Sequence, residues 1–183
     1  MRRHGPPALH PRVSTFHALA RAILFQQVSG AAGAAIYRRL VALFPGQRFP
    51  RPEQVAALSP EALRAAGVSR QKAGYLLDLA SRLADGRLSA RRFGRMSDDE
   101  AIRELTSVRG IGEWTAEIFL MFTLHRPDVL PLGDLGLRRG IQHLFELEEP
   151  PSRELMERLA EPWRPHRSAA SWYLWRVADG GGI

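Results

Sequence analysis

The sequence predicts an all-α protein of about nine or ten short helices. Apolar residues recur at helical spacing along nearly the whole chain, and no segment shows the alternation of a half-buried strand. Good N-capping residues precede these periodic segments, and Pro or Gly follows most of them. The 183 residues suffice for one compact unit or two small subdomains that share a core.

The helices follow one another between these caps and breaks. Ser14 begins the first helix, and Pro45 ends the second. Ser97 and Glu100 form a capping box, and Pro127 breaks the chain after the helix that begins near residue 112. The expected ranges are 14–27, 33–44, 53–57, 59–67, 69–85, 97–105, 112–124, 135–144, 152–160 and 165–177.

The composition favours a globular protein that binds a polyanion. Hydrophobic residues make up 45% of the chain, enough to fold, and the formal net charge is +7. Lys72 is the only lysine, so arginine carries nearly all of the positive charge. A bias in genome base composition explains arginine in place of lysine but leaves the net charge. A basic chain gains affinity for nucleic acid through counterion release from phosphates.

The residues that the chain lacks exclude several classes of protein. Without cysteine it has no disulfide, no thiolate nucleophile and no Cys-ligated iron–sulfur cluster. No apolar run approaches the ~18 residues of a membrane span, and Met1–Pro7 is not followed by the apolar core of a signal peptide. We therefore expect a cytoplasmic protein with no membrane partner.

The segment from Leu105 to Ala116 carries the most information. It predicts a helix, a tight turn containing Gly110 and Gly112, and a second helix. The glycines permit positive φ and close backbone approach where the next helix exposes N–H groups with partial positive charge. We expect N–H groups around Gly110 and Gly112 to bind phosphate; a plain linker between two helices is the alternative.

Asp134 lies beyond this hairpin, within the loop Pro131-Leu132-Gly133-Asp134-Leu135-Gly136. Hairpin, Gly/Pro-rich loop and aspartate together resemble the helix–hairpin–helix (HhH-GPD) DNA glycosylases, in particular the 3-methyladenine DNA glycosylase II (AlkA-like) branch, over roughly residues 14–178. The resemblance implies one catalytic unit, residues 1–183, with two helical lobes and a cleft between them. One lobe is expected at about 1–30 with 130–183, the other at about 31–129. The additional N-terminal α/β domain of many AlkA-like enzymes is not expected in so short a chain.

The resemblance makes Asp134 the catalytic residue. Breaking an N-glycosidic bond places positive charge on C1′ of the deoxyribose, which a carboxylate stabilises directly or by helping a water to attack. An N-alkylated purine is already cationic, so no dedicated general acid is expected. The alternative is a helix N-cap, and the two roles are compatible because a helix N-terminus favours negative charge. The nearby Asp128 is expected to be a solvated residue.

Trp114 indicates which reaction the enzyme does not perform. In relatives that also cut the DNA backbone, a hairpin lysine attacks C1′. Trp114 holds that position here, and Lys72 lies elsewhere, where a surface position or a phosphate contact is expected. The resemblance therefore implies base removal without lyase activity. Trp114 is expected to line the base pocket, to pack in the core, or both.

The resemblance also places a monovalent cation, Na⁺ or K⁺, at the hairpin. Its ligands are expected to be the main-chain carbonyls of Thr106, Val108 and Ile111, since carbonyl oxygen suits hard cations. No cofactor is required for the reaction. Arg109 is expected to contact DNA phosphate, although it and Glu113 occupy positions that other residues often fill in the family.

Gln26 and Gln27 end the first helix and resemble the family's glutamine-containing motif. A glycosylase flips its target nucleotide out of the stack, and Gln27 matches the wedge that fills the gap. Gln26 is expected to line the base pocket or to support the neighbouring loop. Without these roles, both would be surface residues.

The C-terminal segment supplies the aromatic residue that stacks with the flipped base. Trp175 matches that position, which the resemblance places near the aspartate, and an indole face attracts cationic rings. Core packing of Trp172 and Trp175 is the alternative. Arg164 and Arg167 are expected to contact phosphate, or otherwise to lie on a solvated surface.

These observations predict a monofunctional, monomeric DNA glycosylase that removes alkylated bases, such as 3-methyladenine and 7-methylguanine, from damaged double-stranded DNA. A non-catalytic hairpin module that binds DNA is one alternative; Asp134 disfavours it, since a pure binder gains nothing from a carboxylate aimed at DNA. A glycosylase for oxidised purine, uracil or mismatched adenine is another. Several of these lesions are disfavoured because position 114 is not lysine and the chain lacks cysteine.

Overall fold

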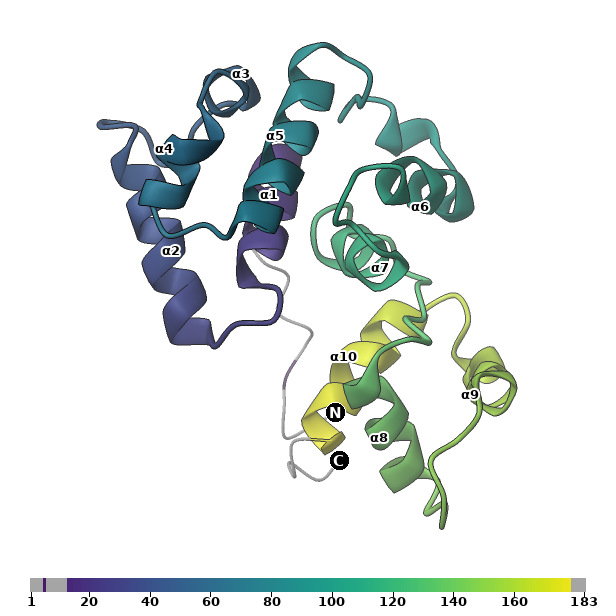
Figure 1. Ribbon diagram of the computed structural model, residues 1–183. Helices are drawn as coiled ribbons and strands as arrows, with labels where there is room; N and C mark the ends of the chain where they lie inside the picture. The colour runs from purple at the N-terminus through teal and green to yellow at the C-terminus, as the bar shows by residue number, and fades with distance from the viewer. Residues whose placement is uncertain (1–4, 6–12, 179–183) are drawn as a thin grey trace. The chain divides into compact units, whose positions relative to one another are not determined.

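The computed structural model describes Gly5 and residues 13–178, and every regular element in them is helical (Figure 1). The α-helices are α1 (Thr15–Phe25), α2 (Gly30–Ala42), α3 (Pro52–Ala56), α4 (Pro60–Ala65), α5 (Arg70–Ala84), α6 (Asp98–Thr106), α7 (Glu113–Phe122), α8 (Leu135–Leu144), α9 (Arg153–Ala160) and α10 (Arg167–Ala178). Two 3₁₀ turns accompany them, η1 (Phe93–Arg95) and η2 (Glu161–Trp163). The predicted all-α class is confirmed. Except for Gly5, the N-terminal segment Met1–Pro7 lies outside the described residues.

Side-chain caps determine where the helices begin. Four predicted caps are confirmed, each accepting a hydrogen bond from the N–H three residues further on: Ser14, Ser59, Ser69 and Ser97. Glu100 completes the capping box by accepting from the Ser97 N–H at 2.7 Å. Ser29, which the periodicity does not single out, caps α2 at Ala32, so α2 begins at Gly30 and not near residue 33.

The described residues divide into two compact units: one consists of residues 13–116, and the other of Gly5 with residues 117–178. In the first unit α5 is the central helix: α1, α3 and α4 pack against it, and α2 packs against α1 (Figure 1). The segment of α1 was expected to join the C-terminal residues, but its contacts with α2 and α5 place it in this unit.

An aliphatic core holds the first unit together. Its fully buried side chains include Leu19, Ile23, Leu40, Leu76 and Leu79. Burying a side chain of this size stabilises the fold by roughly 1.5–3 kcal/mol relative to leaving it exposed. Of the described helices, none is long and apolar enough to cross a bilayer.

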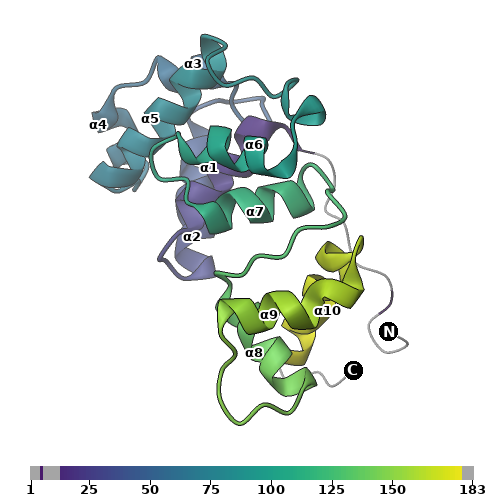
Figure 2. The same cartoon turned by 90° about the vertical axis from the view of Figure 1, so that its right-hand side faces the viewer.

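The second unit is built on α8, α9 and α10 (Figure 2). Its core cluster consists of Leu130, Leu137, Ile141, Met156, Ala160 and Leu174. Helix α8 packs on α10. The two helices are so close at Gly140 that a Cβ there would clash with the main chain of Leu174. This contact positions Asp134, at the start of α8, beside the residues of α10.

Asp128 joins the segment after α7 to the start of α10. Its carboxylate accepts hydrogen bonds from Arg167 Nε at 2.7 Å and from Arg167 Nη2 and Arg164 Nη1 at 2.9 Å each. The hydrogen bonds from Arg167 hold the pKa of Asp128 below its usual value, although burial opposes this. The expectation that Asp128 is solvated is therefore wrong. Both arginines are engaged within the fold, and their contact with phosphate stays a prediction.

Candidate functional site

Asp134 is the N-cap of α8. Its backbone is extended, with φ −83° and ψ 121°, and its Oδ1 accepts a 2.7 Å hydrogen bond from the Leu137 N–H. The main-chain N–H of Asp134 donates to the Pro131 carbonyl at 2.9 Å, which closes the loop before the helix. The predicted cap is confirmed, and the half-buried carboxylate has a fixed place at a helix end that favours negative charge.

Trp175 approaches this carboxylate from α10. Its indole Nε1–H donates a 2.7 Å hydrogen bond to the same oxygen, Oδ1 of Asp134. The ring stacks on Phe122, with centroids 5.8 Å apart and planes inclined by 27°. Trp175 is half-buried, whereas Trp172 is buried and carries the Arg176 guanidinium 3.4 Å above its ring centre. Core packing therefore describes Trp172, and the predicted neighbourhood of Trp175 and Asp134 is present.

Gly136 is the small residue that admits the indole. A Cβ built there would lie 2.8 Å from Trp175 Cδ1 and 3.1 Å from Asp134 Oδ1. Gly133, on the other side of the aspartate, has open space around the same position. The sequence shows the two glycines alike, and only the tertiary contact distinguishes them.

The predicted hairpin joins α6 to α7. Gly110 has φ +82°, a left-handed conformation that favours glycine, and the Tyr75 ring occupies the space a side chain would need. Ile111 is buried, and the Gly112 carbonyl accepts the 3.0 Å hydrogen bond from the Ala116 N–H that starts α7. The helix–turn–helix geometry predicted from the two glycines is confirmed.

Gln26, just past α1, and Asp78 on α5 hold this hairpin in place. The Gln26 Nε2 donates a 2.9 Å hydrogen bond to the Gly110 carbonyl, which bears out the expectation that Gln26 supports the loop. Oδ2 of Asp78 accepts from the Arg109 N–H at 3.0 Å. Burial opposes ionisation of Asp78, but the hydrogen bonds from Arg109 and Arg82 outweigh it and lower its pKa. The side chain of Arg109 is exposed, so this residue contributes its N–H to the fold and its guanidinium to the surface.

Lys72 has a structural task that the sequence did not reveal. Its Nζ donates to the carbonyls of Leu24 at 2.8 Å and Gln26 at 2.6 Å, which lack helical partners at the end of α1. Burial lowers the pKa of this ammonium. Lys72 thus caps the end of α1, in place of the expected surface position or phosphate contact.

Gln27 follows the end of α1. It is exposed, and its backbone is left-handed, with φ +51°.

One hollow of about 530 Å³ collects most of the predicted hairpin residues. Its lining includes Gln26, Gln27, Lys72, Tyr75 and residues 106–112. Sequence reasoning missed Tyr75 and Asp78, because a tyrosine three and an aspartate six residues past Lys72 on α5 give no local signal of a contact with the hairpin.

The hollow fits the expected monovalent cation by the chemistry of its donors. Thr106, Val108 and Ile111 all line it, and their carbonyls belong to the end of α6 and the turn, where intrahelical partners run out. Val108 already accepts a 3.1 Å hydrogen bond from the Ile111 N–H. Carbonyl oxygens are donors that suit a hard monovalent cation. Among the described residues, no group of three His, Cys, Asp or Glu that could hold a metal is found.

Trp114 lies in the first turn of α7 and is 47% exposed. A residue buried in the core would not show this exposure, so simple core packing is wrong for Trp114. Its predicted place in the base pocket stays a prediction.

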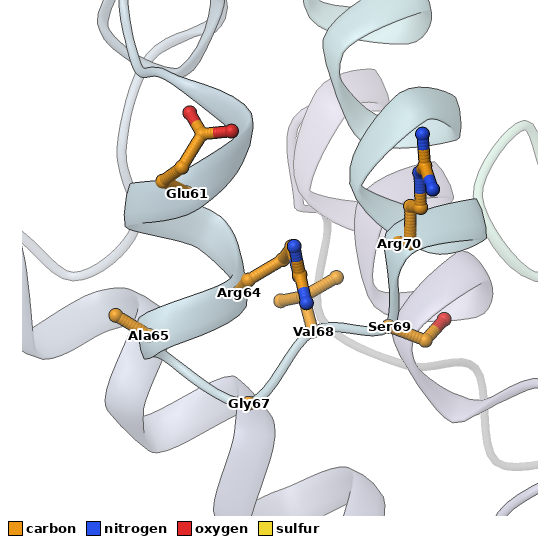
Figure 3. Close-up of a pocket in the computed structure, with 7 residues that line it drawn as sticks. All are labelled: Glu61, Arg64, Ala65, Gly67, Val68, Ser69 and Arg70. Atoms are coloured by element: carbon orange, nitrogen blue, oxygen red, sulfur yellow. The ribbon is translucent and has the colours of Figure 1, made fainter.

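A second hollow of about 560 Å³ lies at the turn between α4 and α5 (Figure 3). Gly67 is left-handed there, with φ +90°, and Arg64 and Arg70 stand on either side of the turn. The turn resembles the hairpin locally: a left-handed glycine, a buried β-branched residue and a new helix follow in the same order. In the sequence, Gly67 predicts only the end of a helix.

A left-handed glycine turn between two helices, together with a helix-capping aspartate held by an indole, defines a helix–hairpin–helix protein with a carboxylate at its candidate reaction centre. The model of the HhH-GPD superfamily of base excision DNA repair proteins matches residues 20–165, and the chain belongs to this family.

Known proteins are similar over most of the chain. DNA-3-methyladenine glycosylase 1 of Schizosaccharomyces pombe is 35% identical over 164 residues, covering 89% of this chain and 72% of that protein. The Bacillus subtilis relative YfjP is 34% identical over 171 residues, which make up 91% of this chain. This chain spans 60% of the length of YfjP. The structure of the Schizosaccharomyces pombe 3-methyladenine DNA glycosylase in complex with abasic DNA superposes with a TM-score of 0.81 at 32% identity, covering 96% of this chain and 87% of that one.

Proposed function

We propose that this chain is a monofunctional DNA glycosylase that hydrolyses the N-glycosidic bond of alkylated bases in double-stranded DNA. The observation that carries the proposal is the Asp134 carboxylate, held at the start of α8 by the Trp175 indole and the Leu137 N–H. The relatives named as DNA-3-methyladenine glycosylases support alkylated purines as substrates.

The carboxylate meets the electrostatic need of this reaction. As the bond between C1′ and the base nitrogen breaks, its electron pair goes to the base and neutralises the cationic purine, while positive charge grows on the sugar. Asp134 stabilises that charge. Water then bonds to C1′ and loses a proton, leaving an abasic site. The cationic base stacks on the Trp175 face opposite Phe122, where a cation–π contact contributes on the order of 0.5–2 kcal/mol.

The hairpin and the end of α1 hold the DNA. N–H groups around Gly110 and Gly112 and the exposed side chain of Arg109 contact backbone phosphate. A Na⁺ or K⁺ ion held by Thr106, Val108 and Ile111 would add a positive charge at that contact. Gln27, exposed just past α1, fills the gap left by the flipped nucleotide.

The proposed enzyme removes the base without cutting the strand. Trp114 offers no amine to attack C1′, and the only lysine, Lys72, is bound to two carbonyls at the end of α1. We propose a monomer, the state that the resemblance to the family implies.

Base release from methylated duplex DNA tests the proposal directly. The protein is incubated with duplex DNA treated with a methylating agent, and the released bases are separated by chromatography. We expect 3-methyladenine and 7-methylguanine in the supernatant and alkali-labile abasic sites in the DNA. Tight binding to the duplex without any release would favour a non-catalytic DNA-binding module.

A further inference from the structure

Three groups meet at the start of α8: the Asp134 carboxylate, the edge of the Trp175 indole, and Gly136 with no side chain. The hydrogen bond from the Leu137 N–H ties the carboxylate to its own helix. The bond from Trp175 Nε1 ties it to α10, 41 positions further along the chain. Both donors reach Oδ1, so the direction of the carboxylate depends on how α8 and α10 pack.

We infer that Trp175 is a positioning residue for Asp134 and that Gly136 is the residue that makes this possible; the inference rests on the proposed function. An N-cap bond alone leaves the carboxylate able to turn about its side-chain torsions. A second, charge-assisted bond from another helix fixes the plane of the group. A carboxylate fixed before the substrate arrives loses less entropy when the reacting atoms meet.

The same indole also sets where the base lies. Phe122 stacks against one side of the ring and limits its rotation. The edge of the ring is held by Asp134, so the orientation of its other face follows from that bond. One rigid side chain therefore fixes both the carboxylate and the surface on which the base stacks, and it sets the spacing between them.

At position 136, only glycine fits without a shift of Trp175 or Asp134. A methyl group at 2.8 Å from Trp175 Cδ1 requires the ring to move, and at 3.1 Å from Asp134 Oδ1 it crowds the acceptor as well. Gly136→Ala should therefore break the bond while both Asp134 and Trp175 keep their own side chains. Gly133→Ala makes the same change three residues earlier, where the methyl group meets open space.

The hydrogen bond can be followed by NMR of the indole N–H groups. The chain has four tryptophans, so a ¹⁵N-labelled sample gives a small set of indole signals that Trp175→Phe assigns. We expect the Trp175 signal to be shifted downfield in the wild type and to move upfield in Gly136→Ala, with a much smaller change in Gly133→Ala. An unchanged signal in Gly136→Ala would overturn the inference, whether or not the protein excises bases.

Single-turnover kinetics then separate positioning from a general loss of structure. At saturating enzyme, Trp175→Phe and Gly136→Ala should lower the rate of base release by about 10- to 100-fold, because a hydrogen bond to a charged group is lost. Their Kd for duplex DNA containing an abasic site, which has no base to stack, should stay within about twofold of the wild type.

Trp172→Phe is the matched control for this experiment. It replaces an indole by the same smaller ring one turn earlier in α10, where the Trp172 ring lies against Tyr173 and the Arg176 guanidinium. We expect it to lower thermal stability and leave the rate of base release near that of the wild type. Wild-type rates in both Trp175→Phe and Gly136→Ala would refute the positioning role and leave the proposed function standing. A wild-type protein that releases no base would instead remove the proposed function.

Discussion

The side-chain amide of Gln26 donates a 2.9 Å hydrogen bond to the carbonyl oxygen of Gly110, across 84 positions of sequence. The N–H on the other side of that peptide unit, from Ile111, donates to Val108 at 3.1 Å. Both ends of the peptide are therefore engaged, and the turn that presents the hairpin is rigid. Since Gln26 also stands beside Gln27, one segment connects the proposed wedge to the proposed phosphate site.

Replacing Gln26 by Leu should weaken DNA binding more than catalysis. The loss of one hydrogen bond frees the Gly110 carbonyl and is worth about 0.5–1.5 kcal/mol, or roughly 2- to 12-fold in Kd. Fluorescence anisotropy on a duplex with an abasic site measures the affinity. Gln142→Leu is the control, because that amide also donates to a main-chain carbonyl, at 3.3 Å from Leu147, but far along the chain from the hairpin. Equal losses in both variants would contradict the role of Gln26.

Replacing Gly110 by Ala should destabilise the protein more than the same change at Gly86. Both glycines are left-handed, with φ +82° and +79°, so each substitution incurs a backbone strain of roughly 1–2 kcal/mol. At Gly110 the methyl group also meets the Tyr75 ring, whereas at Gly86 it meets open space. Thermal unfolding of the two variants gives the comparison. Equal shifts in Tm would show that Tyr75 does not pack there as described.

Local signals in the sequence predict the helices but not the contacts between residues far apart in the chain. Ser97, Ser69 and Asp134 cap helices because the serine or aspartate oxygen acts within three residues, which a sequence shows directly. The bond between Lys72 and the end of α1 joins residues 46 and 48 positions apart, and no pattern near Lys72 announces it.

The same limit holds at the site. The resemblance brought Asp134 and Trp175 together, but it assigned the indole only to stacking and gave no reason for Gly136. The sequence suggests phosphate contacts for Arg164 and Arg167 from their charge alone. It does not show that Asp128, more than 35 positions away, binds both.

Asp128→Asn should lower the free energy of unfolding by about 1.5–3 kcal/mol near pH 7, because it removes charge-assisted hydrogen bonds to Arg167. The pKa of Asp128 is lowered in the folded state, so its stabilisation is present above the unfolded pKa of about 3.9 and is lost as pH falls through the lower folded value. Urea unfolding of both proteins from pH 7 downward should show their difference shrinking below about pH 4. A difference independent of pH would contradict the ion pair.

His17 should make stability depend on pH in a different range. It stacks on Phe49 with centroids 4.2 Å apart, and its Nε2 lies 2.9 Å from the Tyr37 hydroxyl. Burial, and after it the charges of Arg21 and Arg48, lower its pKa. As pH falls, His17 therefore takes up a proton in the unfolded chain at a higher pH than in the folded protein. The free energy of unfolding should decline as pH falls below about 6.5.

The His17→Gln variant isolates this contribution. Between about pH 7.5 and 5.5 it should lose less stability than the wild type, since glutamine does not titrate and the other histidines are common to both proteins. Urea unfolding at several pH values gives the two slopes. Parallel slopes would refute a lowered pKa of the half-buried His17.

Borohydride trapping should detect no covalent complex with DNA. A lyase forms a Schiff base between a lysine and C1′, which the reagent reduces to a stable cross-link. By the proposed match to the family, Trp114 stands where lyases carry the hairpin lysine, and Lys72 donates to the carbonyls of Leu24 and Gln26. Electrophoresis after incubation with methylated duplex should show abasic DNA and no cross-link. A cross-link abolished by Lys72→Arg would identify Lys72 as a nucleophile and end the monofunctional assignment.

Single-turnover base release by Asp134→Asn, compared with the wild type on the same methylated duplex, tests the account most directly. Asparagine keeps the oxygen that caps α8 and accepts from Trp175 but removes the negative charge, so folding and Kd for abasic DNA should be retained. We predict that the rate of base release falls by at least about 100-fold, the loss expected when the group that stabilises the charged transition state is neutralised. A variant that releases base at the wild-type rate would show that Asp134 is only a helix cap.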